Sequence, residues 1–417
     1  MTPVLVTDSS YRFVPPHEGR AWPRLLSGVI PRYLRRKYGV NEIEIQGAEK
    51  LRTLIDSGHG LLLAPNHCRM SDAVVLQGLS RRLRQPFFVM ASSHLFRGRR
   101  FMAFVLRRLG AFSVYREGVD RQAVRTAVDI LVDAKRPLVL FPEGALSHAN
   151  ERLNALMEGV SFISRTAAKR VARRSADDAS QPRRKVLVVP VAIRYLFRGD
   201  IEQTAAPLLA GIERRLSWRT RDDLSLVERI YRVGPALLAL KELEYLGQPQ
   251  VGEIEERLRR LMDHLLEPLE EEWLDGVGSG SVIGRVKELR KMILPAMIDS
   301  DLDEAEMERR WRQLQDMELA QQLSLYPPGY VASRPTVDRI LETVERFMEH
   351  LSGEEEPHPP TTAVVQVGDA IEVSGKRDRG AAEDPVLTAL EHSLTSMLEE
   401  LSTECRAYEP SKMNDSR

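Results

Sequence analysis

Short apolar runs alternate with longer amphipathic segments over residues 40–200, and this alternation limits the folds open to the chain. The runs at 61–64 and 138–141 are typical of buried strands, and a proline follows each of them. Between such runs, apolar residues recur at helical spacing. Strands that alternate with helices in this way favour an α/β fold, in which helices cover a sheet.

The alternation predicts a specific order of elements. Strands are expected at residues 40–45, 61–64, 87–90, 111–115, 138–141 and 186–193. Helices are expected between them at residues 49–55, 73–83, 95–109, 121–134 and 153–172.

Residues 199–350 have a different texture, because strand-like runs give way to helical periodicity rich in Glu, Arg and Leu. Helices are expected there at residues 253–272, 282–297 and 301–325. Strand-like runs return at 364–367 and 371–373, before one last helix with an apolar face. This order predicts an α/β core interrupted by an all-helical insertion, and no internal repeat is visible.

The same changes in texture predict the domain boundaries. The expected parts are an N-terminal amphipathic segment at 1–39, a core at 40–200, a helical insertion at 201–358, a return strand and helix at 359–402 and a flexible tail at 403–417.

Composition excludes several classes of protein. Of 417 residues, 43% are hydrophobic and 29% are charged, an ordinary globular balance that argues against wholesale disorder. No run approaches the roughly 20 apolar residues needed to span a bilayer, and no secretory signal is visible at the N-terminus. Two cysteines, Cys68 and Cys405, cannot form a disulfide framework. We therefore expect a cytoplasmic protein.

The net charge of zero conceals two basic segments. Residues 81–125 carry eleven basic side chains against two acidic ones, and residues 165–198 carry ten against two. Basic segments in an otherwise acidic chain favour an anionic partner, whether phosphate, nucleotide, nucleic acid or acidic lipid. Solvated helix faces are the alternative interpretation.

The sharpest chemical signal is a histidine followed five residues later by an aspartate, directly after an expected strand. His67 lies in the expected loop and Asp72 in the first turn of the next helix. Strand ends are where α/β folds place reactive groups. A carboxylate bound to one ring nitrogen fixes the tautomer and leaves the other nitrogen as a base. The alternative is that both residues merely cap the helix.

Three further motifs accompany other expected strands. Glu143 and Gly144 follow Phe-Pro at a strand end, where the glycine lets the backbone approach a ligand and the carboxylate can grip a polar acceptor. Arg116 closes another strand and is a candidate phosphate ligand. The last motif is Val-Pro-Val within the strand expected at 186–193. Alone, each is equally compatible with an ordinary turn, surface residue or buried strand.

In order, Asn-His-x4-Asp, Gly-x5-Arg, Phe-Pro-Glu-Gly and Val-Pro-Val strongly resemble the phospholipid/glycerol acyltransferase family, whose best-known members are 1-acylglycerol-3-phosphate acyltransferases. The resemblance implies a glycerol-3-phosphate-acyltransferase-like α/β fold with a mixed sheet flanked by helices. It also implies acyl transfer from a coenzyme A or acyl-carrier-protein thioester to a glycerolipid hydroxyl in phospholipid biosynthesis. No cofactor and no metal are expected.

The resemblance also implies roles for five residues. His67 corresponds to the catalytic base of the family and Asp72 to its charge partner. Arg116 corresponds to the phosphate-binding arginine, and Glu143 and Gly144 to the acceptor-binding motif. The implied acceptor is 1-acylglycerol 3-phosphate, with glycerol 3-phosphate and other lysophospholipids as alternatives.

Two departures from the family pattern concern the acceptor. Arg69 stands where the family usually has serine, and Ala145-Leu146-Ser147 stand where Thr-Arg-Ser is common. A nucleophilic role for Cys68 is a weaker alternative, since adjacent side chains rarely face each other. A His/Asp metal phosphoesterase would need further His and Asp clusters.

The implied lipid substrates predict contact with a membrane. Residues 95–108 and 22–38 both mix large apolar residues with basic ones at helical spacing, which suits an interfacial helix on anionic lipid. We expect peripheral association with the inner face of the membrane and no nucleic-acid partner. The alternatives are that both helices pack on the core, or that the chain is a non-catalytic membrane-surface scaffold.

Overall fold

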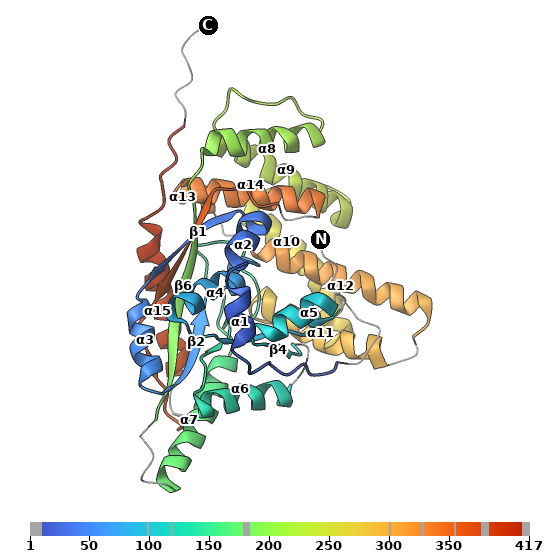
Figure 1. Ribbon diagram of the computed structural model, residues 1–417. Helices are drawn as coiled ribbons and strands as arrows, with labels where there is room; N and C mark the ends of the chain where they lie inside the picture. The colour runs from blue at the N-terminus through green and yellow to red at the C-terminus, as the bar shows by residue number, and fades with distance from the viewer. Residues whose placement is uncertain are drawn as a thin grey trace. The chain divides into compact units, whose positions relative to one another are not determined.

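The structure, a computed structural model, describes residues 11–97, 100–116, 118, 120–177, 184–299, 302–326, 329–353, 356–376 and 383–410. These residues form two compact units (Figure 1). The sheet unit comprises residues 11–198 and 358–405, and the helical unit comprises residues 199–357 and 406–410, as far as each is described.

The sheet unit is built on one mixed sheet of eight strands. Its strands are β1 (Val40–Gln46), β2 (Gly60–Pro65), β3 (Phe88–Ser92), β4 (Ala111–Val114), β5 (Leu138–Val139), β6 (Val186–Phe197), β7 (Thr361–Val367) and β8 (Ile371–Glu372). The order is β1-β7-β6-β2-β5-β3-β4, and β8 also pairs with β6. Pairs are parallel except β6–β7 and β6–β8, which are antiparallel. The predicted α/β fold with a mixed sheet is confirmed.

Helices pack on both faces of this sheet. One face carries α2 (Ile30–Tyr38), α3 (Ala48–Asp56), α4 (Asp72–Leu83) and α5 (Arg100–Arg108). The other carries α6 (Arg121–Asp133), α7 (Gly159–Asp177) and α15 (Pro385–Ser402). The short α1 (Ala21–Leu26) and the 3-10 turn η1 (Ser93–Phe96) complete the described helices of this unit.

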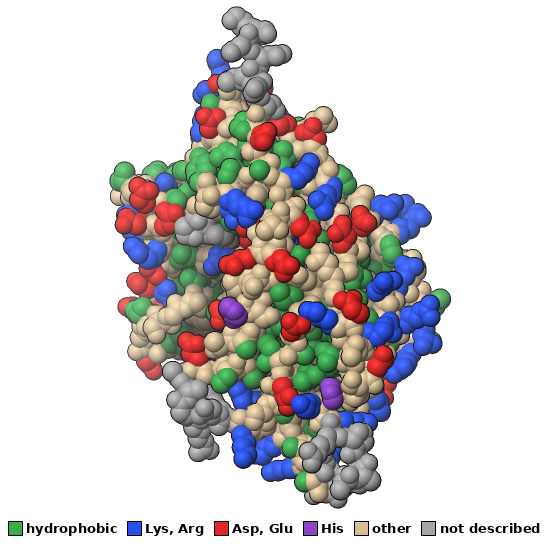
Figure 2. Space-filling view, turned by 90° about the vertical axis from the view of Figure 1, so that its left-hand side faces the viewer, with side chains coloured by type: hydrophobic (Ala, Val, Ile, Leu, Met, Phe, Trp, Pro, Cys, Tyr) green, Lys and Arg blue, Asp and Glu red, His purple; other side chains and the backbone are tan. Residues whose placement is uncertain are grey.

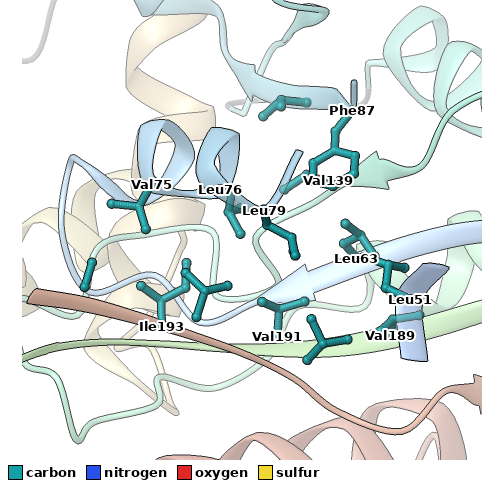
Figure 3. Close-up of a cluster of buried hydrophobic side chains, with 14 of the residues drawn as sticks. Leu51, Leu63, Val75, Leu76, Leu79, Phe87, Val139, Val189, Val191 and Ile193 are labelled. Atoms are coloured by element: carbon teal, nitrogen blue, oxygen red, sulfur yellow. The ribbon is translucent and has the colours of Figure 1, made fainter. Parts of the chain in front are cut away.

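Strand β6 shows why both faces are covered. All twelve of its residues are buried, as expected for a strand with helices on either side. Successive side chains point to opposite faces, so Val189, Val191 and Ile193 join Leu63 and the α4 residue Leu76 in one core cluster (Figure 3). Neighbouring positions of β6 face α7 and α15 instead. The periodicity of two therefore places alternate β6 side chains on the two faces.

The helical unit contains seven helices within its described residues. They are α8 (Ile201–Arg215), α9 (Leu226–Leu246), α10 (Ile254–Trp273), α11 (Val282–Asp299), α12 (Glu304–Ser324), α13 (Tyr330–Ser333) and α14 (Val337–Ser352). Leucines of α10, α11 and α12 form its main apolar core. Every regular element in the described part of this unit is a helix, so the chain leaves the sheet after β6 and returns to it at β7.

A buried ion pair recurs at three successive helix–helix joints of the helical unit. In each joint, a fully buried glutamate near the end of one helix accepts two guanidinium hydrogen bonds from an arginine in the first turn of the next. The paired residues are 16, 15 and 15 positions apart: Glu213–Arg229, Glu242–Arg257 and Glu270–Arg285. These three pairs were not expected from the sequence, because the loops between the paired residues differ in sequence.

Two helices begin later than expected. Residues 153–158, expected to be helical, form a loop before α7, because the backbone N–H groups of Asn154 and Met157 bind Glu143 and the Pro142 carbonyl. The helix expected at 95–109 is preceded by η1, and α5 begins at Arg100. Residues 98–99 of that prediction lie outside the described residues.

The ends of the chain also differ from expectation. Residues 403–410 were expected to be a flexible tail, but Tyr408 is buried and its hydroxyl donates to Glu202 at 2.6 Å. This contact holds the segment against α8. Residues 1–10 of the expected N-terminal segment and residues 411–417 of the expected tail lie outside the described residues.

Candidate active site

His67 and Asp72 meet where β2 feeds α4. The strand ends at Pro65, His67 follows in the loop, and Asp72 is the first residue of the helix. His67 Nδ1 lies 2.8 Å from Asp72 Oδ2. The aspartate is completely buried, whereas the histidine side chain remains 21% exposed. A buried carboxylate thus holds one side of a partly open imidazole ring.

Asp72 is surrounded by hydrogen-bond donors. The Tyr195 hydroxyl donates to Oδ1 at 2.6 Å, and the Arg69 backbone N–H donates to Oδ2 at 2.9 Å. The N-terminus of α4 also favours a negative charge. An ionised carboxylate only accepts, so in neutral His67 the proton sits on Nδ1 and the lone pair on Nε2. This tautomer is the one that a base acting through Nε2 requires.

The loop after β5 braces the histidine. The Phe141 ring stacks on the His67 ring with centroids 4.1 Å apart and planes at 28°. The backbone N–H of His67 donates to Glu143 Oε1 at 2.6 Å, and the N–H of Ser147 donates to the His67 carbonyl at 2.8 Å. The main chain and the ring of His67 are therefore both held by residues some 75 positions away in the sequence.

Glu143 is buried next to His67. Its side chain is 1% exposed, and its second oxygen accepts the Asn154 backbone N–H at 2.8 Å. Burial raises the pKa of Glu143 to about 8, opposed by the two backbone hydrogen bonds. In this geometry the carboxylate links two loops. Its direct contact with an acceptor stays a prediction.

Gly144, the residue after Glu143, is in direct contact with Arg116. Gly144 has φ +67°, and a Cβ there would come within 2.2 Å of Met157 Sδ, so another residue would be strained and would displace the Met157 side chain. The guanidinium of Arg116, an exposed residue, donates to the Gly144 carbonyl. The structure thus connects all five predicted site residues through direct contacts that start at His67 and Glu143.

Two asparagine side chains from neighbouring loops bind the backbone of β6. The Asn66 amide exchanges two hydrogen bonds with the backbone of Ile193, at 2.7 and 3.0 Å. The Asn150 amide does the same with Tyr195, at 2.9 and 2.8 Å. Both side chains are buried. They fix the loops after β2 and β5 to one strand, so Asn150 is a structural residue here.

Sequence reasoning missed Tyr195. It follows Arg194 near the end of the largely apolar strand β6, where an aromatic residue is an ordinary core choice, and no spacing in the sequence connects it to Asp72. Its hydroxyl is nevertheless bonded both to Asp72 and to Ser71. The Arg69 guanidinium, which stands where the family pattern has serine, lies 4.9 Å from the centroid of its ring.

Cys68 occupies a different environment from its neighbour His67. The cysteine is 1% exposed, and its sulfur lies 3.8 Å from Asp72 Oδ1, from Asn150 Oδ1 and from the Ile193 carbonyl. The thiol is therefore part of the buried layer between α4 and β6. This position suits a small core residue better than an accessible nucleophile.

Comparison with known proteins finds one family that matches part of the sheet unit. Residues 42–194 match the acyltransferase family, a span that runs from β1 into β6 and contains all five predicted site residues. A search of curated proteins finds no match. Members of the family transfer acyl groups from a donor to a lipid acceptor in general. The part of the chain between β1 and β6 is therefore similar to the acyltransferase family, and this match supports an enzyme of the acyl-transfer class.

Proposed function

We propose that this protein transfers a fatty acyl group from a coenzyme A or acyl-carrier-protein thioester to the free hydroxyl of a lysophospholipid. The proposed acceptor is 1-acylglycerol 3-phosphate, and the proposed pathway is phospholipid biosynthesis. The observation that carries the proposal is the 2.8 Å contact between His67 Nδ1 and the buried Asp72 carboxylate, in a family domain that transfers acyl groups.

The chemistry follows from this pair. His67 Nε2 takes the proton of the acceptor hydroxyl while the oxygen attacks the thioester carbonyl carbon. Asp72 stabilises the imidazolium that forms. The tetrahedral intermediate collapses, the carbon–sulfur bond breaks, and the thiolate takes the proton from the imidazolium. The products are an ester and a free thiol, and His67 returns to its starting state.

Two arginines support a phosphorylated acceptor. Arg116 reaches the Gly144 carbonyl, and Arg69 lies over the Tyr195 ring next to Asp72. A guanidinium binds phosphate in a bidentate manner. Arg69 follows His67 by two residues, and Arg116 contacts the residue after Glu143, which binds the His67 backbone. Glycerol 3-phosphate would use the same charges, and lysophospholipids with larger head groups remain further alternatives.

Thioester consumption tests the proposal. Wild type and His67→Ala are compared with 1-acylglycerol 3-phosphate, glycerol 3-phosphate and a lysophosphatidylcholine as acceptors, and the product ester is identified by mass. The exposed His392, on α15 of the same unit, is the matched control. We expect acceptor-dependent release of thiol that His67→Ala abolishes and His392→Ala preserves. Equal rates for wild type and His67→Ala would reject the base.

We also propose that the enzyme sits on the cytoplasmic surface of an anionic membrane through α1, α2 and α5. No helix among the described residues is long and apolar enough to cross a bilayer. Leu25 and Val29 are 69% and 59% exposed, and Phe101 on α5 is 79% exposed. Trp22 packs edge-on against Phe104 with centroids 5.6 Å apart, which joins α1 to α5. Large exposed apolar side chains of this kind suit insertion among lipid head groups.

The charge of the same segment supports an anionic surface. Residues 19–41 contain six basic side chains and no acidic one. Gly28, Pro31, Arg32, Arg35 and Arg36 line an open cleft of about 490 Å³. By contrast, the face drawn in Figure 2 mixes acidic and basic side chains. Basic residues next to exposed apolar ones favour phospholipid head groups of negative charge.

A further inference from the structure

Tyr195 connects strand β6 to the carboxylate that binds His67. Its hydroxyl donates to Asp72 Oδ1 at 2.6 Å, while Oδ2 of the same carboxylate faces His67 Nδ1 at 2.8 Å. Tyr195 and Asp72 are 123 positions apart in the sequence and both are buried. The two oxygens of Asp72 are therefore divided between an aromatic hydroxyl and the imidazole.

The direction of this hydrogen-bond chain is set by chemistry. An ionised Asp72 has no proton to give, so Tyr195 is the donor between them. The single hydroxyl proton of Tyr195 is then used, and Ser71 Oγ, 2.8 Å away, donates to Tyr195. Burial, with the charge of Asp72, raises the pKa of Tyr195 well above its usual value, so the phenol keeps its proton at neutral pH.

The tyrosine is itself held rigidly. The Asn150 side chain bonds both the N–H and the carbonyl of Tyr195. Ser71 makes no side-chain cap on α4, so its hydroxyl is free for Tyr195. The side chains that hold Asp72 and Tyr195 in place are buried, and Ser71, Asp72, Asn150 and Tyr195 are each at most 1% exposed. A polar network that is buried and satisfied specifies one geometry.

We propose that Tyr195 is a positioning residue for acyl transfer: it fixes the rotation of the Asp72 carboxylate and, through it, the tautomer and orientation of the His67 ring. Without the hydroxyl, Asp72 Oδ1 keeps the weak Cys68 thiol donor at 3.8 Å. A carboxylate held on one side turns more freely, and the Nδ1–H tautomer of His67 is then less strongly selected. The kinetic part of this inference rests on the proposed function.

Tyr195→Phe tests the proposal with two independent measurements. The first is the ¹⁵N NMR signature of the His67 ring in histidine-labelled protein, assigned with His67→Gln. We expect wild type to show a protonated Nδ1 and an unprotonated Nε2, and Tyr195→Phe to move toward a mixture of the two tautomers. The second is acyl-transfer kinetics. We expect kcat to fall about tenfold, a smaller loss than the 10²–10⁴-fold decrease that follows removal of a general base, and KM to stay within twofold.

Tyr408→Phe is the matched control, because Tyr408 also donates to a carboxylate at 2.6 Å, that of Glu202, and is buried in the other unit. It should lower stability similarly and leave the His67 signature unchanged. Ser71→Ala removes the hydroxyl that donates to Tyr195, and it should shift the ¹⁵N signature of His67 in the same direction but by less. This variant replaces Tyr195→Phe as the test if Tyr195→Phe does not fold. An unchanged His67 signature in both variants would overturn the proposal. The NMR measurement needs no substrate. If the wild type shows no acyl transfer, the proposed function fails, while the NMR result still tests the role of Tyr195.

Discussion

The Glu143 carboxylate accepts the backbone N–H of His67 at 2.6 Å and that of Asn154 at 2.8 Å. One buried side chain thus joins the loop after β2 to the loop after β5. The position of the histidine depends on this link as much as on its own sequence neighbours. The link also carries a titratable group whose pKa burial raises to about 8.

Glu143→Gln should change how stability depends on pH. In the folded protein the pKa of Glu143 is about 8, against an ordinary glutamate pKa of 4.5 in the unfolded chain. The free energy of unfolding supplied by this group is therefore fully present below about pH 4.5 and decreases as the pH rises toward 8. Urea unfolding at several pH values should show a smaller decrease over this window for Glu143→Gln than for wild type. Parallel curves for the two proteins would contradict the raised pKa.

Asp72→Asn should reduce acyl transfer while the protein stays folded. The substitution removes the charge that stabilises the imidazolium and lets His67 adopt the other tautomer. We expect kcat to fall by about 10²–10⁴, measured as thiol release at saturating acceptor. Asp129→Asn is the control, since it breaks an exposed ion pair with Arg170 in the same unit. Full activity of Asp72→Asn would exclude the carboxylate from the mechanism.

Gly144→Ala should destabilise the protein more than Gly58→Ala. Both glycines have nearly the same φ, +67° and +69°, but a Cβ at 144 meets Met157 Sδ at 2.2 Å and one at 58 meets nothing within 4 Å. The control therefore carries the left-handed backbone cost alone, about 1–2 kcal/mol. We expect Gly144→Ala to add about 1–3 kcal/mol of overpacking in denaturant unfolding. Equal losses would show that Met157 moves aside freely.

Arg32→Glu combined with Arg35→Glu should weaken binding to anionic vesicles. Both residues line the cleft on α2, in a segment that has no acidic side chain. Co-sedimentation with phosphatidylglycerol vesicles should fall at least tenfold, because each basic residue near such a surface contributes about 1 kcal/mol. The control is Arg214→Glu with Arg215→Glu, which makes the same change of charge at two exposed residues of α8 and should leave vesicle binding unchanged.

Comparison with phosphatidylcholine vesicles and with added salt separates charge from apolar insertion. Binding that ignores both lipid charge and salt would contradict the electrostatic part of the proposal. Vesicle binding by a wild-type protein that consumes no thioester would favour a membrane-surface scaffold instead.

Much of the sheet unit is readable from periodicity. The run that became β2 and the amphipathic segment that became α4 were placed within a few residues, because burial on a strand or a helix face imposes a regular spacing on apolar residues. The errors fall where the partner is distant. Residues 153–158 look helical, yet they form a loop, since Asn154 and Met157 bind the motif around Glu143.

The helical unit shows the same limit. Its helices were expected from periodicity, but the recurring pairs such as Glu242–Arg257 were not. Charged residues are frequent in this segment, and most of them lie on solvated faces. Nothing in the spacing alone distinguishes a buried glutamate from an exposed one.

The α/β class, the helical segment after β6 and the location of the His67–Asp72 motif at a strand end can be read from the amino-acid sequence, because they follow from spacings within one segment of chain. The folded arrangement was needed to show that Tyr195 donates to the Asp72 carboxylate and that Glu143 accepts the backbone N–H of His67. Hydrogen bonds act over about 3 Å, so these partners are defined by which strands lie side by side. That adjacency is set by packing the whole sheet.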